Sequence, residues 1–366
     1  MLDSYPCPIC TRDDCSQVET FVYLETDGLG SGALPLALVW RRLKTVGRIL
    51  VLARPRRRPV TCRSLTAYQR LRRKVLFQVW FPARESVTLN TAYCTTCGFM
   101  AYSPRPTEED VVAKYEYLKQ YEPDVGGQAG YDSRALQSDL ARAGRVYERC
   151  VAHFGSGKLK VLDYGGGNGK LLKPFVATGH ACFIIDYNDN PVPGVTKIGD
   201  DMSTFATDDT FDLIICSHVL EHVSDLSGLV SFLRRRLDPN GLLYAEVPQE
   251  IWAGLRLEAD PVTHINFFTR SSLAGLFLLN GFDLVESRQQ SADYGKTPLE
   301  VIWVLARGGA DPAGGDPDER RAGLALDVGP LLYPTRRASL RKMYQMSVAP
   351  KFRRLGRIPG SRPSAG

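Results

Sequence analysis

The chain has 366 residues, of which 44% are apolar and 23% charged, and it carries a net charge of +6. This length allows one large domain or two ordinary ones with a sizeable core. The longest apolar stretches are too short to cross a bilayer, and the first residues lack a signal-peptide pattern. We therefore expect a cytoplasmic protein, in which the nine cysteines are metal ligands or buried thiols rather than disulfides.

The positive charge is confined to two segments. Residues 28–84 hold 14 Lys and Arg, residues 331–366 hold nine, and neither segment contains an acidic residue. Once these 23 charges are subtracted from the net +6, the rest of the chain carries −17. Because the body is acidic, this distribution disfavours a uniformly basic nucleic-acid-binding protein.

Two Cys-x-x-Cys pairs lie toward the start of the chain: Cys7 and Cys10, then Cys94 and Cys97. Two intervening residues allow both sulfurs of a pair to reach one ion, and four thiolates suit Zn²⁺ in a tetrahedral site. We therefore predict a structural zinc module built from residues 1–27 and 85–106. The pairs are 83 residues apart, far more than in a usual zinc ribbon. Free thiols are the alternative, and Cys15 or Cys62 could replace one ligand.

Residues 28–84, between the two pairs, form a predicted helical insertion. Apolar residues recur at helical spacing in 36–50 and again in 65–79, with Lys and Arg on the other face. In one interpretation the apolar face packs on the rest of the protein. In another, residues 36–80 lie on an anionic membrane surface at the inner face, attracted by about 1 kcal/mol per basic residue. Phosphate contacts with nucleic acid are a third, disfavoured interpretation.

Residues 107–306 alternate helical and strand patterns, which predicts an α/β domain with a mostly parallel sheet. Thr107 is expected to cap a helix, and residues 133–154 have the pattern of a long amphipathic helix. Strands are expected over 159–163, 181–186, 211–217, 242–247, 282–288 and 300–305, and further helices over 169–178, 226–237 and 271–280. Residues 307–366 begin with a Gly- and Pro-rich linker and continue as a basic tail that we expect to be disordered.

A glycine-rich turn follows the first of these strands, with the sequence Asp163-Tyr164-Gly165-Gly166-Gly167-Asn168-Gly169. Glycines permit positive φ and close approach of a ligand to the backbone, and the N–H groups of the next helix point to the same place. Asp186 ends the following strand, where a carboxylate can accept both hydroxyls of a ribose. The turn lacks the Gly-x-Gly-x-x-Gly spacing of dinucleotide-binding domains. We predict a nucleotide-type site here, although a tight turn without a ligand would show the same glycines.

The run Phe211-Asp212-Leu213-Ile214-Ile215-Cys216-Ser217-His218-Val219-Leu220-Glu221-His222-Val223 resembles class I, S-adenosylmethionine-dependent methyltransferases, in which the fourth strand leads into a His-x-x-Glu-His-Val segment. Residues 235–249 resemble the turn and fifth strand of that family, with Asn240-Gly241 where Gly-Gly is common, and residues 264–286 resemble its C-terminal elements. The resemblance covers roughly residues 105–306. It implies a Rossmann-like, seven-stranded sheet with an antiparallel final strand and helices on both faces.

The resemblance also implies how a cofactor would be held. Gly165 and Gly167 would hold the methionine part, Asp186 the ribose, and Asp201 with Met202 the adenine. Further cofactor contacts are expected from Asp163, Tyr187, Ser217 and His218. Residues 94–115 resemble the zinc-binding module that precedes methyltransferase domains in sugar and secondary-metabolite pathways. In that module a short gap separates the two cysteine pairs, so residues 28–88 have the character of an insertion.

Three of the five histidines lie in the motifs of this resemblance. His218 and His222 are four residues apart, so on a helical turn they would share a face with Glu221 beyond the fourth strand, where open α/β sheets bind ligands. We predict His222 as the general base, with Glu221 beside it and His264 as a second candidate or orienting group. Structural roles for all three histidines stay open. Tyr187 and Glu246 are expected to line the cavity, and a metal ion at His218, Glu221 and His222 is a weaker hypothesis.

The expected function is methyl transfer from S-adenosylmethionine to a small molecule, a sugar or a lipid-linked glycan. Oxygen is favoured over carbon, because the sugar C-methyltransferases that the chain resembles usually carry a further domain. A zinc-ribbon RNA methyltransferase is one alternative, and the acidic catalytic body argues against it. A non-catalytic binding protein that has kept the fold is the other, and the intact glycines and acids argue against it.

Overall fold

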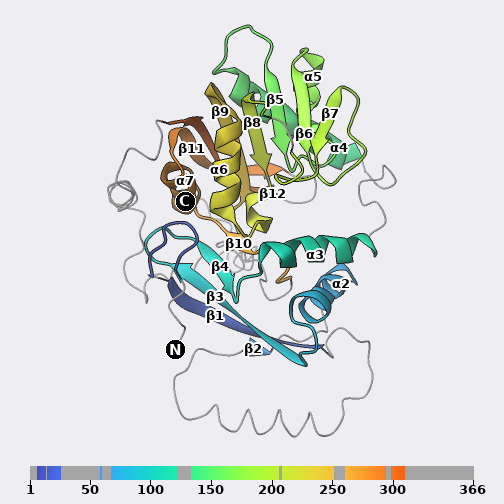
Figure 1. The fold of residues 1–366 in the computed structure, drawn as a ribbon, viewed down its shortest axis with the longest axis vertical. Helices are drawn as coiled ribbons and strands as arrows, with labels where there is room; N and C mark the ends of the chain where they lie inside the picture. The colour runs from blue at the N-terminus through green and yellow to red at the C-terminus, as the bar shows by residue number, and fades with distance from the viewer. Residues whose placement is uncertain are drawn as a thin grey trace, which may run out of the picture.

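The computed structural model describes residues 6–13, 15–25, 58–59, 67–121, 133–205, 208–250, 260–293 and 298–309. These residues form two β-sheets with helices packed against both, one sheet at the top and one at the bottom of Figure 1. Among the described helices, none combines the length and apolar character that crossing a bilayer requires. The first predicted helix of the insertion, residues 36–50, and the tail beyond residue 309 lie outside the described residues.

The larger sheet has seven strands in the order β11-β12-β9-β8-β5-β6-β7. Neighbouring strands from β9 to β7 are parallel, whereas β12 is antiparallel to both β9 and β11. This arrangement confirms the predicted seven-stranded sheet with an antiparallel final strand. The chain runs outward from β5 to β7 and then returns to β8 on the other side of β5, so the ligand crevice of such a sheet lies at the carboxyl ends of β5 and β8. The strands are β5 (Lys160–Tyr164), β6 (Ala181–Ile185), β7 (Val195–Gly199), β8 (Phe211–Ser217), β9 (Leu237–Pro248), β11 (Phe282–Asp293) and β12 (Pro298–Gly308).

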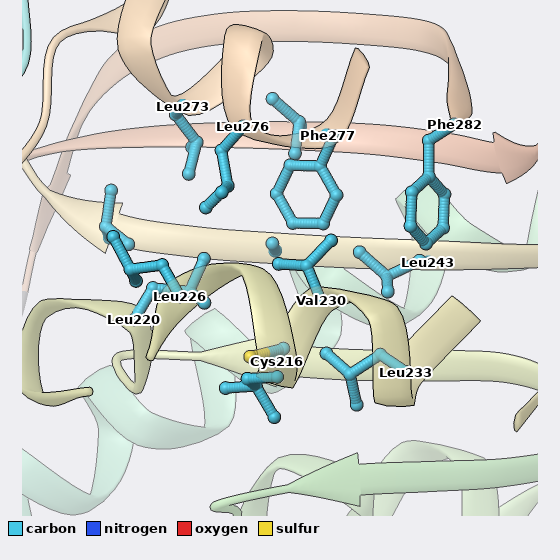
Figure 2. Close-up of a cluster of buried hydrophobic side chains, with 14 of the residues drawn as sticks. Cys216, Leu220, Leu226, Val230, Leu233, Leu243, Leu273, Leu276, Phe277 and Phe282 are labelled. Carbon is cyan, nitrogen blue, oxygen red and sulfur yellow. The ribbon is translucent and has the colours of Figure 1, made fainter. Parts of the chain in front are cut away.

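Helices cover both faces of this sheet. On one face, α6 (Leu226–Arg236) and α7 (Arg270–Leu279) bury Val230 and Leu276 against β8 and β9, as Figure 2 shows. On the other face, α4 (Ser133–Val151) and α5 (Lys173–Ala177) form a second core. Burying each large apolar side chain in these cores contributes about 1.5–3 kcal/mol, which fixes the strand ends that carry the site.

Two predicted boundaries differ from the structure for identifiable reasons. The helix expected over 169–178 is a 3₁₀ turn, Lys170–Leu172, followed by the short α5, because Gly169 has φ +79° and cannot lie inside a right-handed helix. The turn expected at 238–241 lies inside β9. There the register against β8 jumps from Leu237 to Leu242, so the extra residues form an outward bulge rather than a separate turn.

The smaller sheet has the strand order β10-β4-β3-β1-β2. The helix α2 (Ala67–Val75), a π-helical turn at Leu76–Trp80 and α3 (Glu108–Lys119) pack on it. Thr107 caps α3 through a reciprocal pair of hydrogen bonds with Asp110, as the predicted cap requires. The apolar face of the described part of the insertion is covered by protein in this core. The strands are β1 (Cys15–Leu24), β2 (Arg58–Pro59), β3 (Ser86–Cys94), β4 (Met100–Ser103) and β10 (Asn266–Phe267).

One strand of the smaller sheet comes from the predicted α/β region. β10 pairs antiparallel with β4, and Arg105 donates to the Asn266 side chain at 2.5 Å and to the Ser224 carbonyl at 2.7 Å. Asn266 in turn donates to the carbonyls of Leu220 and Val223 at 2.7 and 2.6 Å. The predicted zinc module and the predicted α/β domain are therefore joined by strand pairing and by buried hydrogen bonds at the turn that follows β8.

Candidate active site

The glycine turn after β5 combines close packing on one side with open space on the other. Gly165, Gly167 and Gly169 all have positive φ. A Cβ on Gly165 would lie 2.4 Å from Val219 Cγ2, whereas a Cβ on Gly167 would meet nothing within 4 Å. The Gly167 amide donates to Asp186 Oδ2 at 2.8 Å, which ties the turn to the end of β6. The turn is thus rigidly placed while leaving space in front of Gly167.

A cavity of about 320 Å³ lies along this turn, at the carboxyl ends of β5 and β8. Its walls are the glycine turn, Asp163, the Ser217–His218 pair, and Asp139 with Arg142 from α4. Five predicted cofactor contacts therefore lie around one cavity: Asp163, Gly165, Gly167, Ser217 and His218. Tyr187 and Glu246, which were expected to line the cavity, are not among its walls.

Asp163 is the least satisfied group in the cavity wall. It is 1% exposed, and neither carboxylate oxygen accepts a hydrogen bond. Burial raises the pKa of Asp163 to about 7, although the charge of Arg142 opposes this rise. A buried acceptor without a donor carries a cost of about 1–3 kcal/mol, and a cationic or N–H-bearing ligand would remove that cost.

Arg142 was not singled out from the sequence, although it organises the far wall of the cavity. Its guanidinium lies 3.1 Å from Glu246 Oε1 and also donates to Ser217 Oγ. Tyr244 donates to Glu246 Oε2 at 2.8 Å. Burial disfavours the charge on Glu246, but His218 and Arg142 outweigh burial and hold the pKa of Glu246 well below its usual value. One sequence feature could have identified Arg142: it lies one helical turn after Ser138, which is buried on the inner face of α4.

His218 begins the turn after β8 in an unusual backbone conformation. Its φ is +59°, and its amide donates to the Glu246 carbonyl at 2.8 Å. Its Nδ1 lies 3.2 Å from Glu221 Oε1, and its Nε2 lies 3.6 Å from Glu246 Oε1. Burial disfavours the charged ring, yet the two carboxylates raise the pKa of His218 above its usual value.

His218 and His222 do not share a helical face, contrary to the interpretation drawn from their spacing. Only Leu220–His222 forms a 3₁₀ turn, because the left-handed backbone of His218 precedes it. The two rings instead lie on either side of Glu221, with His222 Nε2 at 3.9 Å from Glu221 Oε1. His218, Glu221 and His222 do lie close together, as their spacing predicted, but a turn rather than a helix brings them together.

His222 and His264 lie side by side, with ring centroids 4.7 Å apart. His222 Nδ1 lies 2.6 Å from the Thr263 carbonyl, so Nδ1 carries the proton and Nε2 bears a lone pair. Burial lowers the pKa of His222 to about 3, which keeps the ring neutral. For His264, burial is outweighed by the Glu250 carboxylate, 2.7 Å from its Nδ1, and the pKa rises.

The residues expected to hold ribose and adenine occupy the ends of β6 and β7. Both oxygens of Asp186 accept backbone N–H groups at 2.8 Å, from Gly167 and Asn188. Asp201 accepts from Ser203 and, at 3.1 Å, from the hydroxyl of the half-exposed Tyr187. Met202 packs against the core below them. These side chains lie on one edge of the sheet, beside the glycine turn.

A second group of side chains, the cysteine cluster (Cys7, Cys10, Cys94 and Cys97), lies at the end of the smaller sheet. All four are buried, their sulfur atoms lie within 4.8 Å of one another, and the Cys7–Cys97 and Cys10–Cys94 sulfurs are 3.5 and 3.6 Å apart. Gly98, with φ +79°, turns the chain after the second pair. Cys15 lies opposite Cys94 in the β1–β3 register but outside this four-membered group, and Cys62 lies outside the described residues.

Part of the chain matches a known protein family. Residues 129–287 match a family model described as a methyltransferase domain. The chain is also similar to proteins named ubiquinone biosynthesis O-methyltransferase. It is 28% identical to that of Rickettsia akari over 26% of this chain and 44% of the relative, and 28% identical to that of Bradyrhizobium diazoefficiens over 31% and 49%. The chain thus spans slightly less than half the length of these two relatives.

Solved structures give a weaker likeness. A magnesium protoporphyrin IX methyltransferase from Synechocystis, solved with bound SAH, is 18% identical with a TM-score of 0.41, over 53% of this chain and 99% of its own. An S-adenosylmethionine-dependent methyltransferase from Mesorhizobium loti is 17% identical with a TM-score of 0.37, over 46% and 99%. Neither likeness bears on the acceptor of this chain.

Proposed function

We propose that this chain, whose residues 129–287 form a class I, S-adenosylmethionine-dependent methyltransferase domain, moves a methyl group to a hydroxyl of a small molecule. Oxygen is the acceptor atom that the names of the curated relatives favour. Sugars belong to this class of acceptors because they carry hydroxyl groups. The observation that carries the proposal is the unsatisfied carboxylate of Asp163 in a cavity bounded by bare glycine backbone.

The cavity walls fit the donor. Asp163 offers an anionic acceptor to its amino-acid end, and the open space at Gly167 admits a ligand against the backbone. Asp186 and Asp201 stand at the next two strand ends, where a ribose and an adenine would extend. When bound, S-adenosylmethionine would supply a methyl group on an electrophilic sulfonium. The ion pair of Arg142 and Glu246 joins α4 to β9 behind this cavity.

The acceptor hydroxyl must lose its proton as oxygen attacks carbon in line with the departing sulfur. We assign the uptake of that proton to Nε2 of His222, which bears a lone pair because Nδ1 donates to the Thr263 carbonyl. Glu221, 3.9 Å from that nitrogen, would stabilise the imidazolium that results. His264, held by Glu250, would orient the acceptor.

The cysteine cluster supports a structural zinc ion. Four buried thiolates within reach of one ion leave no open position for chemistry, so this zinc would hold the smaller sheet in place. Membrane contact through residues 36–80 stays a prediction. The apolar side chains of α2 and the π-helical turn are already packed in the protein core, and residues 36–50 lie outside the described residues.

Calorimetric titration of the full chain with S-adenosylhomocysteine tests the donor site. Gly167→Asn is the informative variant, because Asn tolerates the left-handed backbone while its side chain enters the open space. We expect at least tenfold weaker binding. Gly144→Ala is the matched control, since Gly144 lies inside α4 and a Cβ there would meet nothing within 4 Å, so its binding should equal that of the unchanged chain. Folded protein that gives no heat with either donor or product would remove the proposal.

A further inference from the structure

Three side chains beyond the end of β8 have the composition of a metal-binding set. Glu221, His222 and His264, here called the turn cluster, offer one carboxylate oxygen and two imidazole nitrogens within 4.8 Å of one another. Ligand atoms on one ion with bonds of about 2.1 Å lie about 3 to 4 Å apart. The distance between His222 Nε2 and Glu221 Oε1 is 3.9 Å, which already falls in this range.

The outer nitrogen of each histidine is already engaged in the manner of a metal ligand. His222 Nδ1 donates to the Thr263 carbonyl at 2.6 Å, and His264 Nδ1 lies 2.7 Å from the Glu250 carboxylate. A backbone carbonyl or a carboxylate behind the ring fixes the tautomer and leaves Nε2 unprotonated for an ion. Because Nδ1 is engaged in both rings, Nε2 is the candidate ligand atom of each, and His222 Nε2 lies 3.9 Å from Glu221 Oε1.

Glu221 supplies the second, independent observation. It is 1% exposed, and neither of its carboxylate oxygens accepts a hydrogen bond of normal geometry. Its Oε1 lies 3.2 Å from His218 Nδ1 and 3.9 Å from His222 Nε2. A buried carboxylate is costly unless it is paired and hydrogen-bonded, and a divalent cation would compensate it.

The backbone around the turn cluster is held in place from outside. The Ile265 amide donates to the Glu221 carbonyl at 2.8 Å, and Asn266 donates to the carbonyls of Leu220 and Val223. Because β10 also pairs with β4, the segment that carries His264 cannot drift from the turn that carries Glu221. The ligand positions are therefore preorganised by both sheets.

We propose that the turn cluster binds a divalent first-row metal ion, with coordination positions left open for oxygen atoms of the acceptor. Two imidazoles and one carboxylate are a set that suits Zn²⁺, Fe²⁺ or Mn²⁺ with open sites. This role of the ion rests on the proposed function. The ion would bind the acceptor hydroxyl and lower the pKa of that hydroxyl, so that its proton leaves to water before the oxygen attacks. One lone pair cannot serve both roles, so His222 is a ligand when the ion is bound and takes the proton, as proposed above, only when the ion is absent.

Mn²⁺ alone, titrated into the zinc-loaded full chain and followed by the loss of its free electron paramagnetic resonance signal, tests ion binding without donor or acceptor. We expect saturable binding of about one Mn²⁺ per chain. His264→Ala should abolish it, and Glu250→Gln, which touches no ion, should weaken it roughly 10–100-fold through the histidine it holds. His153→Ala is the matched control, because His153 is an exposed histidine just beyond the end of α4.

Binding of S-adenosylhomocysteine to each variant reports whether its fold is intact. Lost Mn²⁺ binding with retained product binding in His264→Ala supports the proposal. If the unchanged chain binds product but no Mn²⁺, or if His264→Ala binds Mn²⁺ as the control does, the ion site is wrong while the proposed methyl transfer stands. If product does not bind either, the methyl-transfer proposal fails instead.

Discussion

The cysteine cluster and the turn cluster can each surround an ion, but they differ in what they leave free. The cysteine cluster is fully buried and offers four thiolates, so an ion there is closed to other ligands. The turn cluster offers three ligands, and its two histidine side chains are each 23% exposed. One arrangement suits a structural role and the other a chemical one, although both depend on the same pairing of β4 with β10.

Cys94→Ser should have the largest effect, because it opens the closed cluster. We expect the bound zinc to fall from about one per chain toward none and turnover to fall more than 100-fold, since the smaller sheet supports the turn after β8. Metal analysis and a methyl-transfer assay measure the two losses. Cys182→Ser, a buried thiol of β6 far from the cluster in sequence, should keep its zinc. Full zinc in Cys94→Ser would contradict the closed site.

His222→Ala tests the open cluster. Turnover should fall about 100-fold or more, whether His222 takes the proton or holds an ion, while the affinity for S-adenosylhomocysteine stays unchanged. Steady-state kinetics and calorimetry separate the two quantities, with His153→Ala as the control. Unchanged turnover would take His222 out of the chemistry.

Brief dialysis against EDTA compares the two clusters in one sample. An ion with open positions exchanges readily, whereas four buried thiolates retain zinc, so we expect turnover to fall roughly tenfold and zinc content to stay constant. Added Mn²⁺ should restore the rate. Turnover that survives EDTA would favour His222 as a metal-free base.

Asp163→Asn should have the smallest effect, because it alters a buried carboxylate outside both clusters. Its pKa of about 7 in the folded chain exceeds the ordinary value of 3.8, so ionisation opposes folding. This cost is absent below pH 4, grows up to pH 7 and is constant above it. We expect the variant to unfold about 4 °C higher at pH 8, with no gain at pH 4, and to bind product about tenfold more weakly. A lower unfolding temperature at pH 8 would contradict this account.

The proposed donor side of the site was predictable because its parts are local in sequence. A strand, a run of glycines and Asp186 at the end of the next strand follow one another, and the strand order of the large sheet brought them together as expected. Arg142 was missed because its contacts, Ser217 and Glu246, lie 75 and 104 residues away. Helical periodicity alone could not separate it from the other arginines of α4.

The proposed acceptor side was only partly predictable. The pattern His-x-x-Glu-His placed three titratable residues together, but the left-handed backbone of His218 turns them around Glu221 instead of along a helix. The contacts of His222 with Thr263 and of His264 with Glu250 join segments that no periodicity connects. These contacts depend on the pairing of β10 with β4, two strands far apart in the chain, and no local sequence pattern predicts that pairing.

The pairing of β10 with β4 also limits how this protein can be divided. A fragment cut at residue 107 would keep the large sheet but lose Arg105 and leave the backbone of Asn266 and Phe267 as an uncovered sheet edge. Such an edge invites self-association, so a recombinant catalytic fragment should precipitate where the longer chain does not. Grafting new acceptor specificity onto this scaffold therefore means exchanging both sheets together.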